Sequence, residues 1–175
     1  RRRVAEVGRR QSAAAREIGP LPGVVDPDRR AAGKASLRRY CEIYHATAFY
    51  LAWSADHLEL LEDTQRVIES GGKIARCMPR GGGKTSIALT AVEFAINYGY
   101  HRFVSLIAAV APKAEELLES IIFEFETNDL LLEDFPEICF PIRCLNHIRN
   151  RSRGQIYQGV PTDMIWKADK FVFPT

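Results

Sequence analysis

Residues 77–89 read CMPRGGGKTSIAL, a run of three glycines followed by a lysine and a threonine. The pattern G-x-x-x-x-G-K-[ST] is typical of loops that hold phosphate groups. Gly83, Lys84 and Thr85 fill the end of this pattern, whereas Met78 stands where its first glycine belongs. The stretch is therefore a damaged phosphate site, a chance glycine run in a plain turn, or a variant of the phosphate site.

The sequence on both sides of the glycines favours a phosphate site. Residues 73–78 predict a short strand, and residues 103–111, FVSLIAAVA, form an apolar run typical of a strand covered on both faces of a parallel sheet. The intervening residues 86–97 predict a helix that is buried on most sides, because its polar residues fall on one narrow stripe, namely Ser86, Thr90, Glu93 and Asn97. Residues 114–125 carry the single apolar face of a surface helix.

This order of elements predicts an α/β fold. Strand, glycine loop, helix, strand and helix follow one another, as in the parallel sheet of P-loop NTPases. The glycine loop then lies at the carboxyl end of its strand, which is where such sheets bind ligands. Further helices precede the sheet. Residues 2–18 predict an exposed helix, residues 20–28 a linker rich in proline and glycine, and residues 36–48 a helix with apolar spacing. Another helix is expected from the N-cap Ser54 to Gly71.

The loop residues have a physical basis for binding phosphate. Three glycines let the backbone approach phosphate oxygens, and the N–H groups of Gly81, Gly82 and Gly83 can form an anion cradle at the start of a helix. Lys84 can reach the β and γ phosphates, and the Thr85 hydroxyl can ligate Mg²⁺. A plain turn does not need Lys-Thr before a buried helix. We therefore expect the loop to bind ATP and Mg²⁺.

Composition and charge limit the class of protein. The chain has 175 residues, of which 46% are hydrophobic, enough for one domain with a core. We divide it into a basic helical arm and linker, 1–35, and a domain, 36–175. The net charge of +2 is unevenly spread: residues 1–40 hold 11 Lys and Arg against 4 Asp and Glu, and residues 143–175 hold 6 against 2. These two basic runs could contact the phosphates of nucleic acid, although a charge run is more often solvated surface.

Other composition features favour a cytosolic protein without a metal site. No apolar run approaches the roughly 20 residues of a membrane helix, so we expect no membrane contact. Four cysteines without a clear pairing pattern fit a reducing compartment. Cys139, Cys144 and His147 could form a three-ligand cluster, but no second cysteine pair stands at zinc spacing, which argues against it.

The loop and its surroundings resemble the large terminase subunits, the ATP-driven motors that package DNA into phage and other viral capsids. Residues 80–85, RGGGKT, place Arg80 four residues before the lysine, as in the variant loop of that family. The segments WSADHL at 53–58 and ETNDLLLEDFPEICFPI at 126–142 extend the resemblance over most of the chain. The altered loop is thus similar to a working variant.

The resemblance implies roles for the loop residues. Lys84 and Arg80 would be catalytic, with Arg80 sensing or stabilising the γ phosphate, unless Arg80 only makes a surface salt bridge. Thr85 would bind the metal ion. The residues expected to contact nucleotide in this stretch are Arg80, Gly81, Gly82, Gly83, Lys84, Thr85 and Ser86.

The family also holds adenine with a segment that precedes the loop strand. Trp53 and His57 are the expected contacts here, and Asp56 and Gln65 are candidates by position. Each has a structural alternative: Trp53 as a core residue, Asp56 as a first-turn carboxylate of a helix, and Gln65 as a solvated side chain. His57 is the residue for which an adenine contact has the better case.

The resemblance further implies a function and partners. The chain would be the amino-terminal portion of a motor ATPase domain that couples ATP hydrolysis to translocation of duplex DNA in the cytoplasm of the host cell. Its expected partners are duplex DNA, the small terminase subunit, the capsid portal and further copies in a ring. We find no apolar strand ending in the acidic Walker B residues and no nuclease domain, and so expect ATP binding with poor hydrolysis by residues 1–175 alone. The alternatives are a helicase-like P-loop ATPase and a nucleotide-binding module without turnover.

Overall fold

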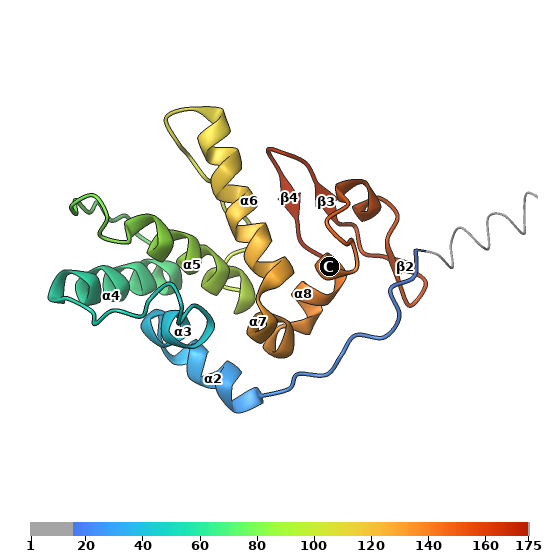
Figure 1. Cartoon of the computed structure of the whole chain (residues 1–175), viewed down its shortest axis with the longest axis horizontal. Helices are drawn as coiled ribbons and strands as arrows, with labels where there is room; N and C mark the ends of the chain where they lie inside the picture. The colour runs from blue at the N-terminus through green and yellow to red at the C-terminus, as the bar shows by residue number, and fades with distance from the viewer. Residues whose placement is uncertain (1–15, 175) are drawn as a thin grey trace, which may run out of the picture.

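The computed structural model describes residues 16–174 and shows a mixed α/β fold, as predicted at the level of class. Its described part contains seven α-helices and two small antiparallel sheets (Figure 1). The helices are α2 (Pro27–Ala35), α3 (Leu37–Tyr44), α4 (Ala55–Ser70), α5 (Lys84–Asn97), α6 (Ala111–Thr127), α7 (Asp129–Asp134) and α8 (Pro136–Arg143). A 3₁₀ turn, η1 (Arg149–Ser152), precedes the strands β1 (Ile156–Tyr157), β2 (Val160–Pro161), β3 (Ile165–Trp166) and β4 (Phe171–Val172).

The amino-terminal part of the described chain differs from the predicted helix and linker. Most of the helix expected at 2–18 lies outside the described residues, but its expected end is wrong, because Glu17 forms a β-bridge with Ile156. The helix α2, which was not predicted, starts within the expected linker. Asp26 caps α2 by accepting a hydrogen bond of 2.8 Å from the Arg29 N–H. α2 packs against α3 and α7, and the proposed division at residue 35 stays a prediction.

The helices α3 and α4 begin at the predicted residues, α3 from its apolar spacing and α4 from its N-cap Ser54. Ser36 accepts from the Arg39 N–H at the start of α3, and Ser54 accepts from the His57 N–H at the start of α4. α4 stops at Gly71, which has a φ of 77° in the left-handed region that glycine adopts readily. α3 ends at Tyr44, short of the predicted residue 48, at the point where the ring of His45 enters the core.

The helix α5 occupies the centre of the fold. It packs against α3, α4 and α6, and Figure 1 shows α4 and α5 on one side of α6 with β3 and β4 on the other. The predicted helix is present, and three of its four polar stripe residues, Thr90, Glu93 and Asn97, are buried, whereas Ser86 is exposed. Asn97 donates a hydrogen bond of 2.6 Å to the Tyr40 hydroxyl on α3. The polar residues of α5 therefore share its buried face with apolar ones such as Phe94.

The two strands expected beside the glycines are not formed. Residues 73–78 and 103–108 are extended but pair with no strand in the described part of the chain. Their apolar side chains stay exposed, to 84% for Phe103 and 89% for Ile107. A strand is stabilised by neighbours on both sides, and these two segments are not hydrogen-bonded to each other. A parallel sheet is thus not shown by residues 16–174.

The carboxyl-terminal third packs around α6 and joins the same hydrophobic core as the other helices. The predicted surface helix is confirmed as α6, whose buried side chains are Ile121, Ile122 and Phe125. α6 packs against α7 and α8, and two hairpins follow. In the second hairpin β4 pairs antiparallel with β3. No helix within residues 16–174 is long and apolar enough to cross a lipid bilayer.

A fully buried carboxylate joins α2, α3 and α7. Asp134 Oδ2 accepts a hydrogen bond of 2.6 Å from the Tyr44 hydroxyl and one of 2.7 Å from Arg29 Nε. Arg29 Nη2 donates a second bond of 2.7 Å to Asp134 Oδ1. Removing Arg29 would leave a buried charge without its counter-ion, which is a strongly destabilising change.

We therefore expect the free energy of unfolding of the Arg29→Ala variant, measured by urea denaturation, to be about 3 kcal/mol lower than that of the wild type. The matched control is Arg66→Ala, since Arg66 makes only a surface pair with Asp63 and its loss should cost less than about 1 kcal/mol. Equal losses in the two variants would contradict the role given to Arg29.

A buried ion pair connects α3 to α5. His45 Nε2 lies 2.8 Å from Glu93 Oε2, and His45 Nδ1 lies 3.6 Å from Glu124 on α6. Burial alone would lower the pKa of His45, but the close contact with Glu93 and the charges of Glu93 and Glu124 raise the pKa above its ordinary value. Burial also raises the pKa of Glu93, although His45 opposes it. Both groups thus bind their protons more tightly in the folded chain.

The free energy of unfolding should consequently fall as the pH rises. The contribution of His45 is fully present below its unfolded pKa of about 6.5 and is lost as the pH passes its raised folded pKa. Urea denaturation between pH 6 and 8 should show this decline in the wild type and a flatter profile in His45→Gln. His101 is exposed and makes no ion pair with the described residues, so His101→Gln is the matched control and should keep the wild-type slope. An unchanged slope in His45→Gln would refute the assignment.

Candidate functional site

The glycine loop leads directly into the first turn of α5. Gly81 and Gly83 have φ values of 80° and 67°, in the left-handed region. A Cβ at Gly82 would lie 3.3 Å from the Pro79 carbonyl oxygen, a contact tighter than most that real side chains make. Gly83 is the N-cap of α5 and provides no side chain to bond the free N–H groups of the first turn. The backbone conformation thus favours glycine at 81 and 83, and a side chain at Gly82 would require a small shift of the Pro79 carbonyl.

Lys84 folds back into the loop. Its Nζ donates hydrogen bonds of 2.6 Å to the Met78 carbonyl and 2.7 Å to the Pro79 carbonyl. The ammonium group therefore lies on the inner side of the turn, at its base. This position combines the charge of Lys84 with the positive end of the α5 helix dipole.

The remaining loop side chains are exposed. Arg80 lies at the tip of the turn, and it makes no ion pair with any residue from 16 to 174, so the alternative of a surface salt bridge finds no support there. The side chains of Thr85 and Ser86 lie in the first turn of α5 and are open to solvent. All the residues predicted from 80 to 86 are accordingly gathered at one helix terminus.

His57 is the one upstream candidate that contacts the loop. Its Nε2 lies 3.0 Å from the Gly82 carbonyl oxygen, and its Nδ1 lies 2.7 Å from Ser54 Oγ. The Trp53 ring packs edge-on against the His57 ring with centroids 6.0 Å apart. Trp53 is also packed on the core and donates its indole N–H to Glu42 at 3.0 Å, as expected from its structural alternative. The structure therefore brings His57 to the loop and places Trp53 behind it.

The two other upstream candidates lie away from the loop residues. Gln65 Oε1 accepts a hydrogen bond of 2.9 Å from the Leu37 N–H at the start of α3. Gln65 is half-buried, so its structural alternative of a solvated side chain describes it only in part. Asp56 is exposed in the first turn of α4, where a carboxylate is favourable. Ser54 was predicted only as a cap, and its second contact, with the His57 ring, was missed. The spacing of three residues between them in a first helical turn was the available signal.

Ion pairs of Arg76 attach the segment that precedes the glycines to α4. Arg76 pairs with Glu59 at 2.8 Å and with Asp63, both on α4. These two carboxylates raise the pKa of the Arg76 guanidinium, while Arg66 and Arg76 lower the pKa of Asp63. The charge of Arg76 thus binds the segment before the loop to α4.

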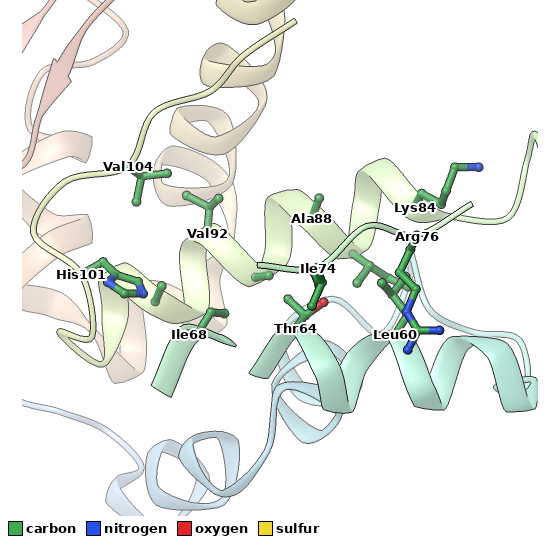
Figure 2. A pocket seen from close by; sticks show the side chains of 13 residues that line it. Leu60, Thr64, Ile68, Ile74, Arg76, Lys84, Ala88, Val92, His101 and Val104 are labelled. Carbon is green, nitrogen blue, oxygen red and sulfur yellow. The ribbon is translucent and has the colours of Figure 1, made fainter. Parts of the chain in front are cut away.

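A cavity of about 390 Å³ adjoins the loop between α4 and α5. Figure 2 shows the segment carrying Ile74 and Arg76 along one side and His101 and Val104 at the far end. The side chains from the two helices are mostly aliphatic, and the labelled ones are Leu60, Thr64, Ile68, Ala88 and Val92, with Lys84 at the loop end. The polar side chains among the residues that line the cavity are Thr64, Arg76, Lys84 and His101.

The described residues contain no group of three or more His, Cys, Asp or Glu side chains placed to hold a metal ion. Cys139 is buried in the core, and His147 pairs with Glu126 at 3.1 Å. Comparison of the chain with protein-family models, curated proteins and solved structures found no match.

Proposed function

We propose that residues 78–86 bind the phosphates of ATP. The observation that carries the proposal is the position of Lys84, whose ammonium lies against the Met78 and Pro79 carbonyls inside a turn of three glycines. Phosphate oxygens are stronger acceptors for an ammonium group than neutral carbonyls are, so a bound phosphate would compete for Lys84.

The geometry of the loop fits such a ligand. Gly82 leaves open the space that a Cβ would fill next to Pro79, and the N–H groups at the start of α5 have no capping side chain. The same N–H groups and the helix dipole favour an anion. Gly81 to Gly83 would therefore supply backbone donors, and Lys84 the positive charge.

The chemistry of hydrolysis would involve three further side chains. The exposed hydroxyl of Thr85 would hold Mg²⁺, which when bound neutralises charge on the phosphates. Ser86 offers a second hydroxyl in the same turn. Arg80, exposed at the loop tip, would contact the γ phosphate and, with Lys84, stabilise charge during phosphoryl transfer.

We further propose that this ATP site belongs to a viral DNA-packaging motor of the large terminase type, which couples ATP hydrolysis to translocation of duplex DNA. The resemblance of residues 53–58, 80–85 and 126–142 to that family supports this proposal. So does the hydrogen bond between His57, in the first of these segments, and Gly82, in the second. The site would then be part of a parallel P-loop sheet, and the motor would act in the host cytoplasm as a ring, with the small subunit and the portal as partners.

Two basic parts of the chain meet at one edge of the fold, where duplex DNA would bind. The Ile18 N–H donates to the Ile156 carbonyl at 3.0 Å, and the Ile156 N–H donates to the Arg16 carbonyl at 2.9 Å. These bonds hold the end of the basic arm beside the turn that carries Arg151 and Arg153, both exposed. A Cβ added at Gly154 would lie 2.9 Å from the guanidinium of Arg16. The two basic segments are therefore in contact.

Replacing Lys84 should weaken nucleotide binding. We expect the Lys84→Ala variant to bind Mg·ATP roughly ten- to a hundredfold more weakly in calorimetry, because a charge-assisted phosphate contact is lost. The control is Lys73→Ala, which removes the same charge from an exposed position before the loop and should leave the affinity unchanged. Wild-type affinity in Lys84→Ala would overturn the proposed site.

Duplex DNA should bind weakly, without sequence preference and with steep salt dependence, since phosphates are contacted. The double variant Arg151→Ala, Arg153→Ala should lower the slope of log K against log salt by about 2, because each lost phosphate contact removes about 0.9. The double variant Arg66→Ala, Lys113→Ala changes net charge equally at exposed positions on α4 and α6, outside both basic runs, and should keep the slope. Binding that does not depend on salt in a filter assay would contradict the prediction.

A further inference from the structure

We infer that His57 is a positioning residue of the phosphate-binding loop and that its ring acts on the loop backbone. The inference rests on the proposed function, because it assigns His57 a task within the same site. It differs from an adenine contact, the role expected for this residue from the sequence. The argument starts from the two hydrogen bonds of the His57 ring.

The partners of the ring fix where its proton lies. The Gly82 carbonyl oxygen, 3.0 Å from Nε2, can only accept, so Nε2 carries a hydrogen atom. Ser54 Oγ, 2.7 Å from Nδ1, can donate its own hydrogen to a neutral ring or accept one from a charged ring. The bond to Gly82 is therefore present in both protonation states, and neither ring nitrogen is free for a nucleobase.

The bond to Gly82 sets the orientation of a loop amide. The Gly82 carbonyl belongs to the same peptide group as the Gly83 N–H, and in a trans peptide the two point in opposite directions. A carbonyl held toward His57 consequently directs the Gly83 N–H away from the ring. Gly83 is the N-cap of α5, so this N–H lies next to the free N–H groups of the first turn.

The loop needs such a restraint because of its composition. Glycine has the greatest backbone freedom of any residue, so a loop of three glycines loses much entropy when it closes on a ligand. A side chain that holds the free loop in its bound shape reduces that loss. His57 is itself held by the Ser54 cap and by the Trp53 ring, and both are fixed to the start of α4.

The test compares three ligands that share phosphates and differ in the base. Calorimetry of His57→Leu should show a loss of about three- to tenfold, equal for Mg·ATP, Mg·GTP and magnesium tripolyphosphate, because one hydrogen bond to the loop is absent. His57→Gln should recover part of the affinity, since its amide can donate to Gly82. The control is His101→Leu, at the far end of the cavity, which should bind all three ligands as the wild type does.

A second measurement reads the loop without any ligand. Hydrogen exchange of the amides from 81 to 85 should be faster in His57→Leu than in the wild type, while the amides of α6 keep their protection and show that the variant is folded. A loss confined to ATP would mean that His57 contacts the base, and it would overturn the inference. Wild-type binding and exchange in His57→Leu would overturn it as well. A wild-type chain that binds none of the three ligands would reject the proposed function together with this inference.

Discussion

The buried pair of His45 and Glu93 determines where α5 lies, and the glycine loop depends on α5. Removing two ionisable groups from water costs several kcal/mol for each, and only close contact between them offsets that cost. Sliding α5 by one turn along α3 would break the 2.8 Å contact between His45 and Glu93. Glu93 would then be buried without a partner, which is energetically unfavourable. The bond from Asn97 to Tyr40, one turn further along α5, imposes the same register. Apolar packing alone would tolerate neighbouring registers much better than these polar contacts do.

The loop is held between this helix and a second fixed point. On one side it enters α5 at Lys84, and on the other Arg76 attaches it to Glu59 and Asp63 of α4. α4 is joined to α3 through the bond of Gln65 to the Leu37 N–H. The two ends of the loop are therefore set by one framework of helices, while the glycines between them keep their conformational freedom. Two side chains restrain that freedom. Lys84 does so from inside the turn, through hydrogen bonds to the Met78 and Pro79 carbonyls. His57 does so from outside the turn, through its hydrogen bond to Gly82.

The parts of the fold that the sequence predicted are those with local causes. Ser54 and Gly71 delimit α4 because a cap and a left-handed glycine act within one turn, and the spacing of apolar residues located α5 and α6 in the same way. The helix α2 was missed because Pro27 was taken as a linker residue, although proline is well suited to a first helical turn after a cap such as Asp26. The contacts of His45, Gln65 and His57 join segments far apart in sequence, and no local pattern reports which residue will lie opposite.

The same distinction explains the two unformed strands, and it ties the sheet to the phosphate site. The expected strands at 73–78 and 103–111 are mostly exposed instead of buried. A strand exists only through hydrogen bonds to another strand, and a run of residues does not specify its partner. In residues 16–174 these segments lie beside the cavity between α4 and α5, with Ile74 and Val104 at its walls and Phe103 and Ile107 in solvent. A phosphate loop works at the carboxyl end of a strand because the sheet holds the loop's first residue still. Pairing of these segments as strands would cover the exposed side chains and would also fix the position of Met78. The same strand pairing would therefore stabilise the proposed sheet and strengthen phosphate binding at the proposed site.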